Sequence, residues 1–417
     1  MRLLRLSNAT AGELLAARRR RDVAAEQTAA RILADVRRGG DRALLRWTGW
    51  LDGLRLTPGT LWVSPSEFRS ARRDVSAELV RAVRHAARNI RRVAERQKPG
   101  PWSFAVEPGV RVSQRVLPLE IIGCYIPGGR SSLVSTLLMT AIPAQVAGVR
   151  RIVITCPRPN QALLAAASLL GVEEVARVGG AQAIGAMAFG TKSFPRVDKI
   201  FGPGNRYVNA AKRLVSSECA IDLPAGPTEV LILASRGDPR FIAADLLAQA
   251  EHDADAVAFF VTTSANLAQA VRQEVSRQLR TLPKTNPARV SLGHNGVILL
   301  ARSLAAGLHF ANEFAPEHFG LPGGEPALLE KVRSAGSVFL GPWSAQPLGD
   351  YSSGTNHVLP TSGWARARGG LSTWDFVKCL SVQRISRAGL RRLAPVVTAL
   401  ADAEGLAAHA RAVEVRQ

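Results

Sequence analysis

The sequence predicts a soluble α/β protein built on parallel sheets, and three observations support this prediction. The chain has 417 residues, of which 47% are hydrophobic and 21% charged, so it can form two or more packed domains. Short β-branched runs alternate with helical stretches, and glycine or proline joins most runs to the next helix. This alternation is typical of βαβ units, whose crossover helices cover the faces of a parallel sheet.

The predicted elements fall into two α/β portions between helical ends. Residues 1–100 follow mainly a helical period, and so do residues 386–412. The first portion predicts strands at residues 120–126, 151–156, 174–178, 199–201 and 230–233. The second predicts helices at 241–252 and 265–281, and strands at 256–262, 296–300 and 336–340.

The N-terminus predicts a cytoplasmic protein, because Asn8 and Glu13 interrupt the apolar stretch that a secretory signal needs. Thr10 to Glu13 is typical of a helix capping box, although the arginine-rich start also resembles a transit peptide. The longest charge-free run, between Arg130 and Arg150, contains several hydroxyl residues and favours a buried helix over a membrane span. We therefore expect no membrane partner.

The net charge of +21 makes nucleic acid a partner to consider, and 12 of those charges lie in residues 1–100. Arg81, Arg84, Arg88 and Arg91 recur at helical spacing, so they line one face of a helix. Such a stripe is either a solvated surface or a phosphate-binding face. Neither a zinc-finger spacing nor an aromatic RNA-binding motif accompanies it, which makes nucleic-acid binding the less favoured hypothesis.

Three glycine-rich segments follow predicted strands, at residues 127–129, 179–182 and 202–205. Glycine lets the backbone approach a ligand there, and the next helix offers free N–H groups to an anion. Together the segments suggest a dinucleotide, although none matches GxGxxG and each glycine could serve the turn alone. Residues 185–192 come near a P-loop but have Thr191 where lysine is required, so ATP use is not supported.

Candidate reactive groups gather in the second half of the chain. The four cysteines are widely spaced without CxxC, so a metal would need imidazole, carboxylate or amide ligands. Gln249 and His252 lie three apart on a predicted helix, where they could share a ligand or belong to the core. Glu317 and His318 follow Pro316 in a predicted loop, where they could serve two proton transfers or simply begin a helix.

Of two further polar segments, one indicates a functional site and the other does not. Residues 349–357, GDYSSGTNH, are rich in donors and acceptors beside a predicted strand, which favours the wall of a site. Glu404 and His409 are five apart on a helical pattern, so spacing alone predicts two surface residues.

These segments resemble the histidinol dehydrogenase family along nearly the whole chain. The resemblance rests on GCYIPGGRSSLVSTLLMTAIPAQVAGV (123–149), GGAQAIGAMAFGT (179–191), FGPGNRYVNAAKR (201–213), IDLPAGPTEVLILA (221–234), DLLAQAEHD (245–253), APEH (315–318) and AGSVFLGPWSAQPLGDYSSGTNHVLP (335–360), with a weaker match at 35–53. It implies an NAD-dependent, zinc-dependent oxidation of L-histidinol to L-histidine, the final steps of histidine biosynthesis, by an intertwined homodimer with one Zn²⁺ per subunit.

The family's functional residues carry over onto matching positions. The implied zinc ligands are Gln249, His252, Asp350 and His409, the last supplied by the partner subunit. The implied catalytic residues are Glu317 and His318, and the implied cofactor contacts are Tyr125, Gln182 and Asn205. The implied substrate contacts are Thr228, Gln249, His252, His318, Asp350, Glu404 and His409, with His357 as a neighbour.

The family's architecture implies two incomplete Rossmann-like domains with small terminal segments. We expect an N-terminal helical segment at 1–28, a first domain at 29–118 and 235–370, a cofactor-binding domain at 119–234, and a C-terminal segment at 371–417 that reaches the partner's active site. Two departures are Thr228, where serine is common, and residues 130–132 after the glycine pair. Both departures conserve polarity, so they bear on affinity rather than on the reaction. A related dehydrogenase for another polar alcohol remains an alternative, because a fold and its cofactor site can be kept while the substrate contacts change.

Overall fold

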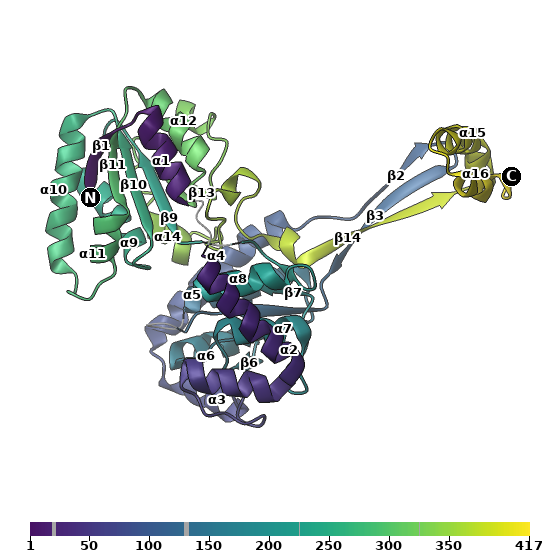
Figure 1. Cartoon of the computed structure of the whole chain (residues 1–417), viewed down its shortest axis with the longest axis horizontal. Helices are drawn as coiled ribbons and strands as arrows, with labels where there is room; N and C mark the ends of the chain where they lie inside the picture. Colours follow the sequence, from purple (N-terminus) through teal and green to yellow (C-terminus); the bar gives the residue numbers. More distant parts are fainter. Residues whose placement is uncertain (19–21, 129–132, 225, 325) are drawn as a thin grey trace.

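The computed structural model describes residues 1–417 except 19–21, 129–132, 225 and 325. It has two lobes, each around one large sheet, and a three-stranded arm that carries the C-terminal helices away from both lobes (Figure 1). The strand pairs of the two large sheets are parallel, which confirms the predicted α/β class. The unusual residues after the glycine pair, 130–132, lie outside the described residues.

The first lobe surrounds a six-stranded sheet with the order β1-β11-β10-β9-β12-β13. Its strands are β1 (Arg2–Arg5), β9 (Glu229–Leu233), β10 (Val257–Thr262), β11 (Gly296–Leu300), β12 (His318–Leu321) and β13 (Ser337–Leu340). One face packs against α9 (Pro239–Ala250), α10 (Ala265–Thr281) and α11 (Ala288–His294), and the other against α1 (Asn8–Arg18) and α12 (Leu304–Phe314). The short helices α13 (Pro326–Leu329) and α14 (Gln346–Tyr351) follow along the chain.

The second lobe surrounds a five-stranded sheet with the order β6-β5-β4-β7-β8. Its strands are β4 (Ile121–Tyr125), β5 (Arg151–Thr155), β6 (Val175–Ala176), β7 (Lys199–Phe201) and β8 (Ala220–Ile221). One face packs against α3 (Pro65–Asp74), α4 (Ala77–Gln97), α5 (Val134–Ala147) and α6 (Gln161–Leu169), and the other against α2 (Val23–Asp52), α7 (Gly180–Phe189) and α8 (Arg206–Val215).

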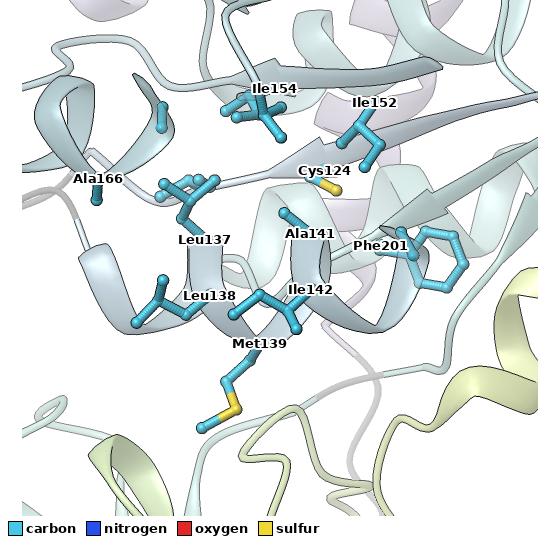
Figure 2. Close-up of a cluster of buried hydrophobic side chains, with 14 of the residues drawn as sticks. Cys124, Leu137, Leu138, Met139, Ala141, Ile142, Ile152, Ile154, Ala166 and Phe201 are labelled. Atoms are coloured by element: carbon cyan, nitrogen blue, oxygen red, sulfur yellow. The ribbon is translucent and has the colours of Figure 1, made fainter. Parts of the chain in front are cut away.

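Helix α5 carries no charged residue, and nearly all of its side chains are buried inside the second lobe. Figure 2 shows Leu137 and Ala141 of this helix pointing toward the strands, where Cys124 and Ile154 meet them. The charge-free run in the sequence predicted a buried helix, and α5 confirms this prediction. Among the residues that the structure describes, no helix is long and apolar enough to cross a membrane.

The arm is an antiparallel sheet with the order β14-β3-β2. It consists of β2 (Trp102–Glu107), β3 (Val110–Pro118) and β14 (Val377–Ile385), the last preceded by the short 3₁₀ helices η1 (Trp364–Arg366) and η2 (Thr373–Phe376). At its far end lie α15 (Arg387–Ala403) and α16 (Ala407–Glu414) (Figure 1). These strands were not among the predicted elements, although Trp102, Phe104 and Val106 alternate with smaller or polar residues in β2. In one chain the side chains of β2 and β14 are nearly all exposed, so the alternation does not mark a core-facing strand.

The sheets group the chain differently from the expected domain boundaries. Helices α2, α3 and α4 were expected beside residues 235–370, but they pack against α7, α8, α6 and α5 of the second lobe. The strand predicted at 230–233 was assigned to the cofactor-binding domain, whereas β9 pairs with β10 and β12 of the first lobe. The N-terminal segment begins with a strand, β1, beside β11. An alternation along the chain predicts elements, but it does not say which sheet each strand joins.

Two local predictions about helices have different outcomes. The arginine stripe lies exposed on α4, while Val83, Ala86, Ile90 and Ala94 on its other side are buried, so the helix has the amphipathic character that its spacing predicts. The capping box at Thr10 is wrong, because α1 begins at Asn8 and the Ser7 hydroxyl accepts the Thr10 backbone N–H at 3.2 Å.

Candidate active site

Glu317 and His318 lie at the amino end of β12, beside the amino end of β9. Helix α12 ends at Phe314, its C-cap Ala315 turns the chain sharply with φ of 50°, and Pro316 leads into the strand. The Glu317 Oε2 atom accepts hydrogen bonds from the Thr228 hydroxyl at 2.5 Å and the Glu229 backbone N–H at 2.8 Å. The helix-start alternative is therefore wrong, since the pair opens a strand and both side chains are buried.

The buried His318 ring is held by one nitrogen. Its Nδ1 lies 3.2 Å from the Glu229 carbonyl, so Nδ1–H donates to that oxygen and the ring gains or loses its other proton at Nε2. Nε2 is buried without a hydrogen-bond partner among the described residues, and it lies 3.7 Å from an Asp350 carboxylate oxygen. Burial lowers the pKa of His318, but the neighbouring Glu317 and Asp350 charges outweigh burial and raise it to about 10.

Helices α9 and α14 pack together and bring Gln249 and Asp350 to this site. The Gln249 amide nitrogen donates to the Thr228 hydroxyl, which leaves its buried Oε1 without a hydrogen-bond partner in the described part of the chain. The Gln346 amide donates to Asp350 at 2.7 Å. Burial raises the pKa of Asp350, but the hydrogen bond and charge of His318 outweigh it and hold that pKa below its usual value.

His252 differs from its expected position. It was predicted on one helix with Gln249, but α9 ends at Ala250 and His252 follows in an exposed turn. Its charge still acts on Asp350 and His357, so it is a neighbour of that cluster. His357 joins the cluster through Nδ1, which lies 3.0 Å from the Asp350 carbonyl, and its Nε2 lies 3.5 Å from the Thr136 hydroxyl of α5. The polar segment 349–357 therefore contacts both lobes.

The donor set around Asp350 fits a zinc ion but is incomplete in one chain. An amide oxygen without a partner, an imidazole and a carboxylate are ligands that zinc accepts. Over the described ranges, no group of three or more His, Cys, Asp or Glu side chains could hold a metal. Glu404 and His409 are exposed at the far end of the arm (Figure 1), so one chain does not bring them to the other predicted ligands.

The predicted cofactor residues lie at the carboxyl edge of the five-stranded sheet. Tyr125 ends β4 and accepts the Gly180 N–H on its hydroxyl at 3.2 Å. Buried Gln182 donates its amide to Asp52 at 3.0 Å, and its Oε1 is without a partner among the described residues. Strand order reverses here, since the chain goes from β4 to β5 and β6 and then back to β7. Such a switch point is where open α/β sheets bind nucleotides.

A buried ion pair supports the third glycine segment. Lys212 Nζ donates to the Gly202 carbonyl at 2.9 Å and pairs with Asp222, which accepts the Gly202 N–H at 2.8 Å. Gly202 has φ of 107°, and a Cβ there would lie 2.1 Å from the Tyr125 carbonyl oxygen, so this position requires glycine. Asn205 follows as the N-cap of α8 and accepts the Tyr207 and Val208 N–H groups. Lys212, Asp222 and Asp52 were not singled out in the sequence, because no local pattern marks them.

The cysteines play no part in this arrangement. Within the described residues none of the four forms a disulfide, and Cys124, Cys156 and Cys219 are buried. Burial raises the pKa of the Cys124 thiol to about 12, so the group is an inert core residue.

A glycine-rich switch point in one lobe and a buried carboxylate–imidazole pair in the other are typical of an α/β enzyme that binds a nucleotide. Comparison with known proteins identifies the family to which the chain belongs. The family model for histidinol dehydrogenase matches residues 16–417. The chain therefore belongs to the histidinol dehydrogenase family of NAD-dependent oxidoreductases.

Individual relatives agree with this assignment. A histidinol dehydrogenase from Methanosarcina barkeri is 46% identical over 398 residues, which cover 94% of this chain and 91% of that protein. One from Geobacillus kaustophilus is 48% identical over 393 residues and covers 92% of each chain. The crystal structure of histidinol dehydrogenase from Elizabethkingia anophelis superposes with a TM-score of 0.93 at 38% identity, and covers 100% of this chain and 98% of that one.

Proposed function

We propose that this protein oxidises L-histidinol through histidinal to L-histidine with two molecules of NAD and one Zn²⁺ per subunit, as the final steps of histidine biosynthesis. The observation that carries the proposal is the His318 ring: its Nδ1 donates to a backbone carbonyl, so protons are exchanged at the buried Nε2, which has no hydrogen-bond partner among the described residues. Zinc held by Asp350 would offset the carboxylate charge that raises the pKa of His318, and Nε2 could then act as a base. The family assignment supplies the substrate.

Two side chains divide the proton transfers in this proposal. His318 Nε2 removes the hydroxyl proton during the first oxidation, and again removes a proton from the hydrated aldehyde during the second. Glu317 activates the water that hydrates the aldehyde. We assign that role to its Oε1, because Oε2 already accepts two hydrogen bonds. Thr228 keeps the hydroxyl of the more common serine and uses it to hold both Glu317 and Gln249. This departure therefore does not favour another substrate.

Gln249, His252 and Asp350, with His409 of a second copy, would hold the zinc ion, which anchors the imidazole and amine of the substrate. Tyr125, Gln182 and Asn205 would contact NAD, which supplies the hydride acceptor. Thr228 and Glu404 would complete the substrate contacts, with His357 beside them. Among the described residues, Gln249 Oε1 and Gln182 Oε1 have no hydrogen-bond partner, which supports the zinc and the NAD assignment respectively.

The test is the stoichiometry of the purified, zinc-loaded protein. We expect two NADH per histidinol consumed, no activity after removal of metal by a chelator, and recovery when zinc is added back. Incubation with other amino alcohols serves as the control. Absence of NADH with histidinol, or one NADH per molecule consumed, contradicts the proposal.

A homodimer that shares its active sites is supported by the arm. Trp102, Phe104, Leu380 and Val382 are exposed on it, and its end carries Glu404 and His409. Exposed apolar surface of this kind marks an interface, and a second copy would bring the missing zinc ligand.

Complementation checks this arrangement. We expect His318→Asn and His409→Asn to be inactive alone. Unfolding and refolding them together should restore up to about a quarter of wild-type activity, since about half of random dimers are mixed and each has one intact site. No recovery, with dimers formed, contradicts a shared site.

A further inference from the structure

Arg18, the last residue of α1, contacts the start of β9, whose backbone holds the proposed catalytic pair, and the corner that leads into that pair. Its Nε donates to the Glu229 carboxylate at 2.6 Å, and an Nη donates to the other oxygen of the same group. It also donates to the carbonyls of Phe314 and Ala315, the second at 3.2 Å. Its guanidinium carbon lies 4.0 Å above the centre of the Phe314 ring. The side chains of Arg18 and Glu229 are only 9% and 2% exposed.

Glu229 connects Arg18 to the active site, because its side chain binds Arg18 and its backbone binds Glu317 and His318. Its backbone N–H donates to Glu317 Oε2 at 2.8 Å, and its carbonyl accepts from His318 Nδ1 at 3.2 Å. Its side chain is anchored by Arg18 and by the Ser362 N–H at 3.1 Å. The backbone of one residue therefore sets the carboxylate orientation of Glu317 and the ring tautomer of His318, and Arg18 holds that residue in place.

The second set of Arg18 contacts acts on the other strand. Ala315 adopts left-handed backbone angles, which are unfavourable for a residue other than glycine. The carbonyls on either side of this corner, those of Phe314 and Ala315, accept from Arg18. The corner directs the chain into Pro316 and Glu317. A planar guanidinium can serve a carboxylate and two carbonyls together, whereas a lysine ammonium is a point charge that cannot match this geometry.

We propose that Arg18 is a positioning residue, which clamps the amino ends of β9 and β12 so that Glu317 and His318 keep their catalytic orientation. The proposal rests on the function proposed above for these two residues. It assigns a role in the reaction to the N-terminal helix, which does not itself contact the reacting groups.

The test compares Arg18→Ala, Arg18→Lys and the control Arg240→Ala, which removes an exposed arginine of the same lobe paired with Asp238. With histidinol and NAD saturating, and below the unfolding temperature, we expect R18A to lose roughly 10- to 100-fold in kcat. The KM for NAD should not change, since the cofactor residues lie in the other lobe. R18K should remain impaired, and R240A should equal the wild type. Millimolar guanidinium chloride should partly restore R18A, but not R18K.

A cycle with Glu317→Gln separates positioning from loss of stability. If Arg18 acts through Glu317, the combined loss in histidinal oxidation is smaller than the product of the two single losses. Three results would overturn the role of Arg18: a combined loss equal to the product of the two single losses, no rescue of R18A by guanidinium, or an unchanged kcat in R18A. If the wild type is active and E317Q is impaired, these results leave the proposed function intact. An inactive wild type or a fully active E317Q would overturn both proposals.

Discussion

Replacement of His318 by asparagine is expected to lower kcat for histidinol oxidation by about 10²- to 10⁴-fold, the usual contribution of a general base. Asparagine can still donate to the Glu229 carbonyl, which His318 Nδ1 contacts at 3.2 Å, so the backbone around the site should be kept. It has no equivalent of Nε2, the buried nitrogen that lacks a partner among the described residues. Substrate binding should be largely retained, because the proposed zinc ligands are unchanged.

Steady-state kinetics with histidinol, together with histidinol binding to the inactive variant, measure this effect. His309→Asn is the matched control, since His309 is exposed on α12 and contacts only Glu313 at 3.8 Å among the described ion pairs. The control should equal the wild type. Turnover of H318N within threefold of wild type, or a loss confined to KM, would remove the base role.

Replacement of Lys212 by methionine is expected to lower the free energy of unfolding by about 3–5 kcal/mol, because it leaves a buried charge without its partner. Both side chains of the Lys212–Asp222 pair are 1% exposed. The pair holds the carbonyl and the N–H of Gly202, so NAD affinity should also fall as this turn loosens. Urea denaturation and NAD titration measure the two effects.

Two further variants test whether the loss of stability comes from the unpaired buried charge. The double variant Lys212→Met with Asp222→Asn should recover part of the lost stability, because the uncompensated carboxylate is gone. Arg277→Met, which removes a 58% exposed side chain from its pair with Glu274, should leave the denaturation midpoint essentially unchanged. A loss below about 1 kcal/mol for K212M would show that the buried pair does not stabilise the lobe as argued.

The site was only partly predictable from local patterns. Glycine after a strand is visible in the sequence, and two of the three segments, at 179–182 and 202–205, lie at one sheet edge as parallel strands require. Glu317 and His318 were expected in a loop, but they open β12, at the amino end of a parallel strand where a ligand is not usually sought. Arg18 is one of 47 arginines, and its partner Glu229 lies 211 residues away. No spacing connects them.

The sequence by itself determined the α/β class, most of the elements of both lobes and the family, because periodicity and motifs are local properties of the chain. Only the tertiary structure decided which sheet α2, α3, α4 and β9 join, that the arm exists, and that Glu404 and His409 lie far from Gln249 and Asp350 in one chain. These features depend on pairing between distant segments. Such pairing depends on how the apolar faces of helices and sheets pack together in the folded protein. The hydrophobic period along the chain predicts each element but does not specify its partner.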